Sequence, residues 1–440
     1  MIRLILKFLI IILVAAVTLL TSCSDKSSPE IGKKPANSAA QARAESGVTS
    51  QAEPASKGRE QLTLEQKLED FGYMYNILKE NYPFFQVNKR LYNVDWLTKR
   101  DVYESLIKSS SSDESFLAYL NIILRDLHNG HTGILSNNLY IKLRMIYQDL
   151  VKGDSSYSKW YEVLENEKAL KRYGLNQNSP KTDSKINDNF TVTNNVRTEK
   201  LTNKVAYIGI KSLDTNCIEG DSKIIASFFN KIKDFKALVI DIRGNGGGDD
   251  RYWSDNIVSM LTDKDLNCNW YNLYRGGKYA EPFIFARTGS KYDKLPPVSD
   301  LINGKLKAYP TEIESDFKYY TTGGKIVKSK KYVDYKGDIY LLVDRGVYSS
   351  AEMFAAFSKD TGFAALVGET TGGDGIGMDP ILCVLPNSGY ILRFPSIMGL
   401  NSEGICNEEF KTRPDVKISA SKNENLLNDE CVKYVLGRIK

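Results

Sequence analysis

Two stretches of this chain share one local pattern, in which a continuous apolar run ends in a sharp turn and an amphipathic segment follows at once. The first covers residues 237–249 and its turn is rich in glycine. The second covers 340–357 and its turn ends in two serines. Apolar runs of this length indicate buried strands, and the segments that follow them have helical spacing. Alternation of this kind predicts an α/β core.

Ser349 stands at the corner of the second stretch, where the strand gives way to the helix. A hydroxyl at such a corner is exposed at the sheet edge. The first N–H groups of the helix and its positive end lie beside any oxyanion formed there. The placement therefore favours a nucleophile. The alternative is a serine that only caps the helix, which is the commoner role of serine at a helix start.

Gly246, Gly247 and Gly248 form the turn of the first stretch. Consecutive glycines let the backbone approach a ligand and point N–H groups at it, as an oxyanion hole or a phosphate site requires. A phosphate loop has Lys and Ser or Thr after its glycines, whereas Asp249 and Asp250 follow here. The formal charge of +5 is also too small to imply a nucleic-acid partner. An oxyanion hole is favoured, and a plain turn is the alternative.

Three further segments, 367–375, 385–389 and 403–416, follow in an order and spacing that resemble those of the S41 peptidases. This family contains the carboxyl-terminal processing (tail-specific) proteases and the tricorn core, and the resemblance covers about residues 63 to 420. It implies a ClpP/crotonase-like spiralled β-sheet with flanking helices, a serine peptidase activity on proteins or peptides, and no cofactor. It also implies that Ser349 is the nucleophile, and that the backbone N–H groups of Ser350 and of Gly246 or Gly247 hold the oxyanion.

The chain departs from the family at the general base. Processing proteases pair the serine with a lysine, and that position is Asp374 here. An exposed aspartate with a pKa of ~4 is a poor acceptor for a serine proton at neutral pH. The tricorn-like branch instead takes a histidine from a helical region ahead of the core. His131 follows Asn129 and Gly130 in a segment similar to that branch's Asp-Gly-His-Thr signature, so the resemblance assigns it as the base.

Glu403, which precedes a glycine and a later Pro-Asp, resembles the glutamate that completes the tricorn-type site. We therefore expect it to orient His131. His128 lies three residues before His131, so a two-histidine metal site is an alternative. No metal is predicted, because the sequence offers no His-Glu-x-x-His pattern and no cluster of cysteines or further histidines. A surface histidine with no catalytic role is the other alternative for His131.

The N-terminus predicts a lipoprotein. Arg3 and Lys7 precede or border the apolar run 8–20, which ends in the Leu-Thr-Ser-Cys lipobox at Cys23. The run is too short to cross a bilayer and has the features of a secretory signal peptide, residues 1–22. Acylation of Cys23, with palmitate or a similar fatty acid, would then tether the protein to a bacterial membrane on its extracytoplasmic side. An uncleaved signal anchor is the alternative.

The remaining chain divides by composition. Residues 23–62 are rich in Ser, Ala, Lys, Glu and Gln, and read as a flexible stalk. A capping box at Thr63 starts an N-terminal helical subdomain, 63–135, which carries the histidine. Residues 136–200 form a polar connecting region in which no PDZ domain is evident, and 201–425 form the peptidase core.

The combined expectation is a membrane-tethered, extracytoplasmic serine endopeptidase that uses a Ser-His arrangement in place of a Ser-Lys dyad. Ser349 and His131 must then lie in one cleft. The alternative is a catalytically inactive ligand- or peptide-binding lipoprotein on the same scaffold, which the departures at Asp374 and Asn129 would suit.

Overall fold

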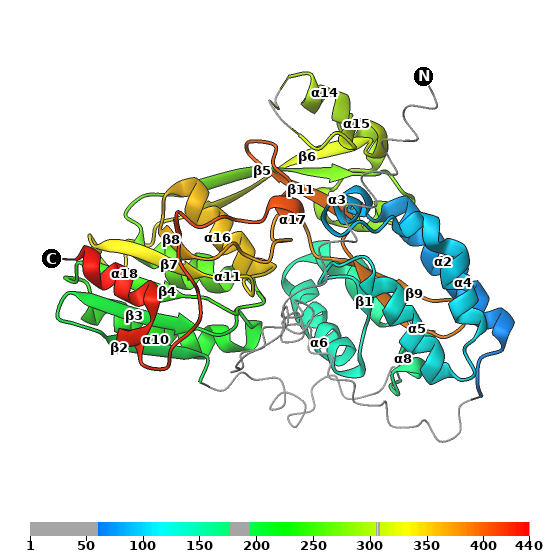
Figure 1. Cartoon of the computed structure of the whole chain (residues 1–440), viewed down its shortest axis with the longest axis horizontal. Coiled ribbons are helices and arrows are strands. Elements are labelled where there is room, and N and C mark those ends of the chain that lie inside the picture. The colour runs from blue at the N-terminus through cyan, green and yellow to red at the C-terminus, as the bar shows by residue number, and fades with distance from the viewer. Residues whose placement is uncertain (1–59, 177–193, 305, 307–308, 440) are drawn as a thin grey trace, which may run out of the picture. The chain divides into compact units, whose positions relative to one another are not determined.

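The computed structural model describes residues 60–176, 194–304, 306 and 309–439 (Figure 1). The predicted signal peptide, the lipidation site Cys23 and nearly all of the predicted stalk lie outside the described residues. The first described helix, α2 (Leu64–Asn81), begins as the sequence predicts, because the Thr63 side chain accepts from the Gln66 N–H and the Gln66 side chain accepts from the Thr63 N–H. In the described part of the chain, no helix combines the length and hydropathy needed to cross a bilayer.

A six-stranded sheet forms the centre of the C-terminal half. Its five consecutive strands β12, β8, β7, β4 and β3 are parallel, and β2 is antiparallel to β3 at one edge. In sheet order the strands are β12 (Val416–Lys417), β8 (Ala365–Gly368), β7 (Asp338–Val343), β4 (Ala237–Asp241), β3 (Val205–Ile210) and β2 (Val196–Lys200).

Helices cover both faces of this sheet. On one face Ile240 and Leu341 pack with α10 (Ile218–Lys231) and α16 (Ser350–Thr361), which link β3 to β4 and β7 to β8. On the other face Val239 and Leu342 pack with α18 (Glu430–Arg438). Burial on both faces explains why these strands read as continuous apolar runs. The predicted α/β core behind a helical N-terminal region is confirmed.

The N-terminal region is helical, and its helices share one hydrophobic core. The part predicted as a polar connection also contains helices, whose aromatic residues Tyr140, Tyr147 and Trp160 are buried in that core. After α2 the region comprises α3 (Phe85–Tyr92), η1 (Trp96–Lys99), α4 (Arg100–Lys108), α5 (Asp113–Arg125), β1 (Gly133–Ile134), α6 (Asn137–Gly153), η2 (Ser155–Tyr157), α7 (Ser158–Leu164) and α8 (Glu167–Arg172).

Two smaller sheets complete the structure. In one, β1 pairs with β10 (Ile391–Phe394), which pairs with β9 (Ile381–Val384), so the N-terminal region is hydrogen-bonded to a C-terminal hairpin. In the other, β5 lies between β11 and β6. The remaining elements are η3 (Thr215–Cys217), α11 (Asp250–Trp253), the π-helix η4 (Ser254–Val258), α12 (Ser259–Leu261), β5 (Leu266–Tyr274), α13 (Glu281–Thr288), η5 (Tyr292–Lys294), α14 (Val298–Ile302), α15 (Ile313–Asp316), β6 (Tyr319–Val327), β11 (Ile397–Asn401), α17 (Asn407–Phe410) and η6 (Leu426–Asn428).

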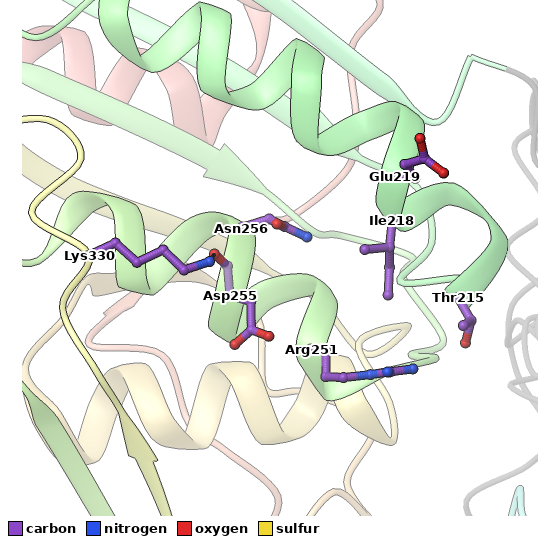
Figure 2. Close-up of a pocket in the computed structure, with 7 residues that line it drawn as sticks. All are labelled: Thr215, Ile218, Glu219, Arg251, Asp255, Asn256 and Lys330. Carbon is purple, nitrogen blue, oxygen red and sulfur yellow. Dashed lines mark hydrogen bonds between the residues drawn. The ribbon is translucent and has the colours of Figure 1, made fainter. Parts of the chain in front are cut away.

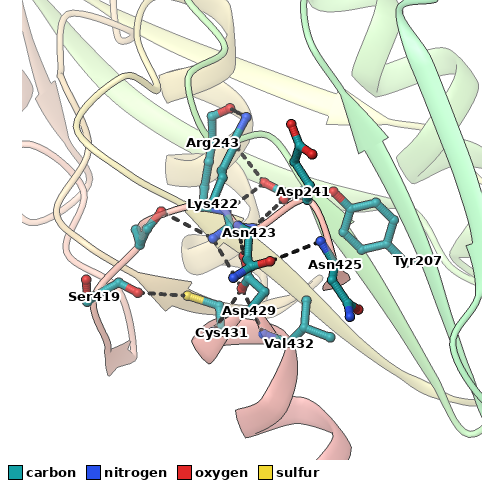
Figure 3. Close-up of polar contacts among 12 residues, drawn as sticks. Tyr207, Asp241, Arg243, Ser419, Lys422, Asn423, Asn425, Asp429, Cys431 and Val432 are labelled. Carbon is teal, nitrogen blue, oxygen red and sulfur yellow. Dashed lines mark hydrogen bonds and ion pairs between the residues drawn. The ribbon is translucent and has the colours of Figure 1, made fainter. Parts of the chain in front are cut away.

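A buried ion network fixes the end of β4, just before the glycine turn (Figure 3). Arg243 donates from Nη2 to Asp241 Oδ2 at 2.6 Å and to Asp429 Oδ2 at 2.9 Å. The three side chains are between 0% and 3% exposed. Asp429 also caps α18 by accepting the N–H groups of Cys431 and Val432. The network therefore ties the base of the glycine turn to the C-terminal helix.

Asp429→Ala should destabilise the protein by about 3–5 kcal/mol, because it removes one partner of a buried guanidinium and also uncaps α18. Urea unfolding measures the loss. The matched control is Glu430→Ala, which removes an exposed ion pair with Lys433 and should cost less than about 1 kcal/mol. Equal unfolding midpoints for the two variants would contradict the structural role given to the network.

Candidate active site

Ser349 lies at the corner between β7 and α16 with strained backbone angles, φ 57° and ψ −126°. A positive φ is unusual for a residue with a side chain, and such strain concentrates at functional positions. The Ser349 N–H donates to the Gly373 carbonyl at 3.2 Å, whereas the hydroxyl makes no capping hydrogen bond to the helix. The side chain is thus available for other chemistry. If Ser349 only capped the helix, its hydroxyl would be hydrogen-bonded to a helix N–H.

The glycine turn lies directly against this corner, because β4 and β7 are neighbouring parallel strands. A Cβ atom on Gly247 would come within 2.8 Å of the Ser350 nitrogen and 2.9 Å of the Ser349 Cβ, so only glycine fits there. The Gly247 N–H donates to Asn245 Oδ1 at 3.0 Å. Gly246 is exposed, with open space where a side chain would stand. The structure thus brings Ser349, Ser350, Gly246 and Gly247 together.

His131 lies in the short loop between α5 and β1, and its ring is buried beside the same corner. The ring centroid is 4.8 Å from that of Tyr348, the residue before Ser349. Its Nδ1 atom is 2.8 Å from Asp374 Oδ2. Burial lowers the pKa of His131, and the Asp374 carboxylate opposes that shift. Among the hydrogen bonds of the described residues, none joins the Ser349 hydroxyl to the imidazole.

Asp374 is the carboxylate that contacts His131. Besides the imidazole, its Oδ2 accepts from Asn129 Nδ2 at 2.9 Å and from the Tyr348 hydroxyl at 3.2 Å. Burial opposes ionisation of Asp374, but the charge and hydrogen bond of His131 and the amide of Asn129 keep its pKa below the ordinary value. The backbone at Asp374 has φ 50°, so the carboxylate is held by a strained turn as well as by its donors.

Glu403, expected to orient His131, has no contact with the imidazole among the hydrogen bonds and ion pairs of the described residues. It lies in the tight turn after β11, where Asn401 Oδ1 accepts the N–H groups of Glu403 and Ile405. Its side chain is exposed to solvent. The residues around Glu403 resemble the family motif, but the turn leaves this side chain exposed and outside the buried site.

Asn129 connects the histidine loop to two carboxylates. Its Nδ2 donates to Asp374 and, at 3.1 Å, to Glu408 Oε1, while its Oδ1 accepts the His131 N–H at 3.0 Å. An aspartate here, as in the family signature, would place a third carboxylate beside the other two. The amide is therefore the side chain that this arrangement requires.

Glu408, on α17, is a site residue that the sequence did not reveal. It is buried and pairs with Lys411 at 3.0 Å. Burial and the neighbouring charge of Asp374 raise the pKa of Glu408 to about 7, although Lys411 and Asn129 oppose the shift. The site thus holds a carboxyl group that titrates close to neutral pH.

His128 takes different partners from His131. Its ring stacks on Tyr92 with centroids 4.0 Å apart, and its Nδ1 is hydrogen-bonded to Asn88 Oδ1 at 2.9 Å. Across the described residues, no group of three or more His, Cys, Asp or Glu side chains is arranged to hold a metal ion. The two-histidine metal alternative therefore gains no support from this geometry.

A separate pocket of 450 Å³ contains none of these residues (Figure 2). Its two cations already have partners, because Arg251 pairs with Asp249 at 2.5 Å and Lys330 Nζ donates to the Asp255 carbonyl at 2.7 Å. The pocket is lined by Thr215, Ile218, Glu219, Arg251, Asp255, Asn256 and Lys330.

The comparison with known families gives one match, to peptidase family S41, over residues 204–418. We refer to residues 204–418 as the S41 region, because this is the part of the chain that the family model matches. A candidate peptidase from Parabacteroides merdae ATCC 43184 has a similar structure, with 20% identity, a TM-score of 0.53 and coverage of 84% of this chain and 96% of that one. Mature CPAF complexed with lactacystin is similar at 13% identity and a TM-score of 0.52, over 86% and 97% of the two chains. These likenesses show the fold, and no curated protein matches the chain.

The S41 region supplies the serine corner, the glycine turn, Asp374 and Glu408. His131 and Asn129 come from the helical region that precedes it. The site is therefore assembled from both parts of the chain, and the 2.8 Å contact between His131 and Asp374 joins them.

The pKa of Glu408 predicts a pH-dependent stability. Its folded-state value of about 7 lies above the ordinary 4.5, so the folded chain binds this proton more tightly than the unfolded chain does. The contribution of Glu408 to stability is therefore full below pH ~4.5 and is lost as the pH rises through ~7. Glu408→Gln abolishes that loss. The free energy of unfolding of Glu408→Gln minus that of the unmodified chain should therefore increase by roughly 1–3 kcal/mol from pH 5 to pH 8.

Urea unfolding at pH 5, 6.5 and 8 measures this difference. Glu403→Gln is the matched control, because the exposed carboxyl makes no contact with the cluster and its removal should shift stability equally at each pH. A Glu408→Gln difference that does not vary with pH would contradict the assignment of a neutral-range carboxyl to this site.

Proposed function

We propose that the protein is a serine endopeptidase that cleaves peptide bonds through Ser349 and His131. The observation that carries the proposal is the strained strand-to-helix corner at Ser349, whose hydroxyl makes no hydrogen bond among the described residues. The preceding residue, Tyr348, packs against a buried imidazole that is held by a carboxylate. The match of residues 204–418 to a peptidase family model supports a protein or peptide substrate.

In the proposed mechanism, His131 Nε2 accepts the Ser349 proton as the serine oxygen attacks the scissile carbonyl carbon. The imidazolium then donates this proton to the leaving amine as the C–N bond breaks. A water molecule repeats the sequence on the acyl-enzyme, which releases the acid product and restores Ser349. No cofactor takes part in these steps.

Asp374 takes the orienting role that the sequence gave to Glu403. A carboxylate on Nδ1 fixes the tautomer that presents Nε2 to the serine, and it stabilises the imidazolium that forms. The 2.8 Å contact supports this role for Asp374, whereas Glu403 is exposed. An aspartate at the lysine position is thus a poor base for serine but a suitable partner for a histidine base.

The oxyanion would be held by the backbone N–H groups of Ser350 and Gly246. Ser350 is the first residue of α16, so its N–H has no partner within the helix. Between the two glycines predicted for this role, Gly246 is favoured because the Gly247 N–H is already bonded to Asn245. Gly247 contributes by letting the two segments approach closely.

Ser349→Ala and His131→Ala should each lower kcat for a fluorogenic peptide by about 10³-fold or more, and the double variant should be little worse than either, because the residues act as one unit. Asp374→Asn should lower kcat by about 10²- to 10⁴-fold by disturbing the orientation of the imidazole. Glu403→Gln is the matched control and should retain the activity of the unmodified chain.

The same assay should show kcat/KM falling on the acid side as His131 gains a proton. Because burial lowers the pKa of His131, this limb should lie below pH ~6.5. Full activity in His131→Ala, or a loss in Glu403→Gln that Asp374→Asn does not show, would overturn the assignment. If Ser349→Ala leaves a measured biological activity intact, the inactive binding protein is the better reading.

We also propose that the peptidase is lipid-anchored through Cys23 and faces the extracytoplasmic side of a bacterial membrane. The support is the charged start, the short apolar run and the lipobox of residues 1–23. Acylation with more than one chain would make the anchor stable.

Cys23→Ser should abolish incorporation of a fatty-acid probe during metabolic labelling, because it removes the acylated thiol. A chain that starts at residue 61 should be soluble and folded, since the described helices begin at Leu64. Cys217→Ser, which changes a buried cysteine of the core, is the control and should keep the label. Labelling that persists in Cys23→Ser would exclude the lipobox.

A further inference from the structure

Arg393 is a cation whose charge acts on the proposed catalytic histidine. It lies on β10, directly opposite Gly133 of β1, and Gly133 is two residues beyond His131. Its charge acts on the imidazole of His131 and lowers the pKa of that ring. Tyr147, Tyr348, Asp379 and Asp374 are the groups that in turn act on the guanidinium. The side chain is half-buried.

The guanidinium of Arg393 has no acceptor in the described part of the chain, where it donates no hydrogen bond and forms no ion pair. Among the described residues, some polar atoms are fully enclosed and lack a partner, such as Arg275 Nε. The nitrogens of Arg393 are not in this group. They therefore keep access to solvent. By contrast, the buried Arg144 is satisfied, because it donates to both carboxylate oxygens of Glu165.

The nearby carboxylates are already engaged elsewhere. Asp374 accepts from His131, Asn129 and Tyr348, and Asp379 accepts from the Tyr147 hydroxyl at 3.1 Å. Neither carboxylate lies within 4.0 Å of the Arg393 guanidinium, the distance that an ion pair requires. Burial lowers the pKa of Arg393, which reflects the cost of holding this cation away from water without a contact partner. An external acceptor would offset that cost.

We propose that Arg393 is a substrate subsite that binds a carboxylate of the peptide beside the scissile bond. This inference rests on the proposed function. The planar fork of a guanidinium matches a carboxylate bidentately, with two parallel N–H donors. The charges of Asp374 and Asp379 also act on this guanidinium, and their negative charge favours a monoanion over a phosphate dianion as its ligand. The carboxylate has two sources, an Asp or Glu side chain near the cleaved bond or the C-terminus of the peptide.

Three peptides with one cleavable core separate these sources: a neutral peptide with an amidated end, the same peptide with a free C-terminus, and an amidated peptide with Glu beside the scissile bond. Arg393→Gln should lower kcat/KM about 10- to 100-fold for at least one carboxylate-bearing peptide and less than about 2-fold for the neutral one. The peptide that responds identifies the source. Arg345→Gln, an exposed arginine paired with Glu369, is the control for loss of a positive charge and should show no such selectivity.

Equal losses on all three peptides, or no loss on any, would overturn the subsite. Thermal melting checks the fold of Arg393→Gln. If that variant does not fold, Arg393→Lys keeps the charge but loses the fork, and an unchanged preference for the carboxylate peptides would then overturn the proposal.

Binding to the Ser349→Ala chain, followed by fluorescence anisotropy of the same labelled peptides, separates this inference from the proposed function. A preference for a carboxylate that disappears with Arg393→Gln supports the subsite even if no peptide is hydrolysed. Hydrolysis that depends on Ser349 without any such preference supports the peptidase and excludes the subsite.

Discussion

The Asp374 carboxylate is the interaction on which the site depends. Its side chain is 8% exposed, and one of its oxygens accepts from His131, Asn129 and Tyr348. Two of these donors come from the helical region, and the third precedes Ser349 in the S41 region. One buried acceptor thereby fixes the histidine loop, its supporting amide and the serine corner relative to one another. Without this acceptor the imidazole would be buried with no partner for Nδ1.

The two departures from the family pattern explain each other in physical terms. Asp374 in place of a lysine supplies the acceptor for His131, and with Glu408 nearby it makes a second acidic group at 129 costly. Asn129 keeps the backbone contact to His131 that an aspartate would make, and it adds donors for both carboxylates. Considered separately, Asp374 and Asn129 each favoured an inactive scaffold. Together they form a satisfied hydrogen-bond network around a histidine.

The sequence predicted the parts of this structure that local pattern determines. Apolar runs ending in turns located the central sheet, the Ser349 corner and the glycine turn, because the period of apolar residues follows from the element they form. The helices between 136 and 176 escaped notice because polar residues surround the helical spacing of Tyr140, Leu143 and Tyr147. Asp374 and His131 are 243 residues apart, and nothing local marks them as partners. Glu403 matched a motif, but the turn that carries it faces solvent.

The two-residue strand β1 has a consequence for when the site can exist. It holds the histidine loop by pairing with β10, near the C-terminal end of the chain. A growing chain therefore carries His131 early, but it gains β10, which holds the histidine loop, only after Ser349 and Asp374 have been made. A chain that ends between Asp374 and β10 contains His131 and Ser349 but lacks the strand that holds the histidine loop. On the proposed function, the catalytic arrangement therefore forms only after β10 has been made.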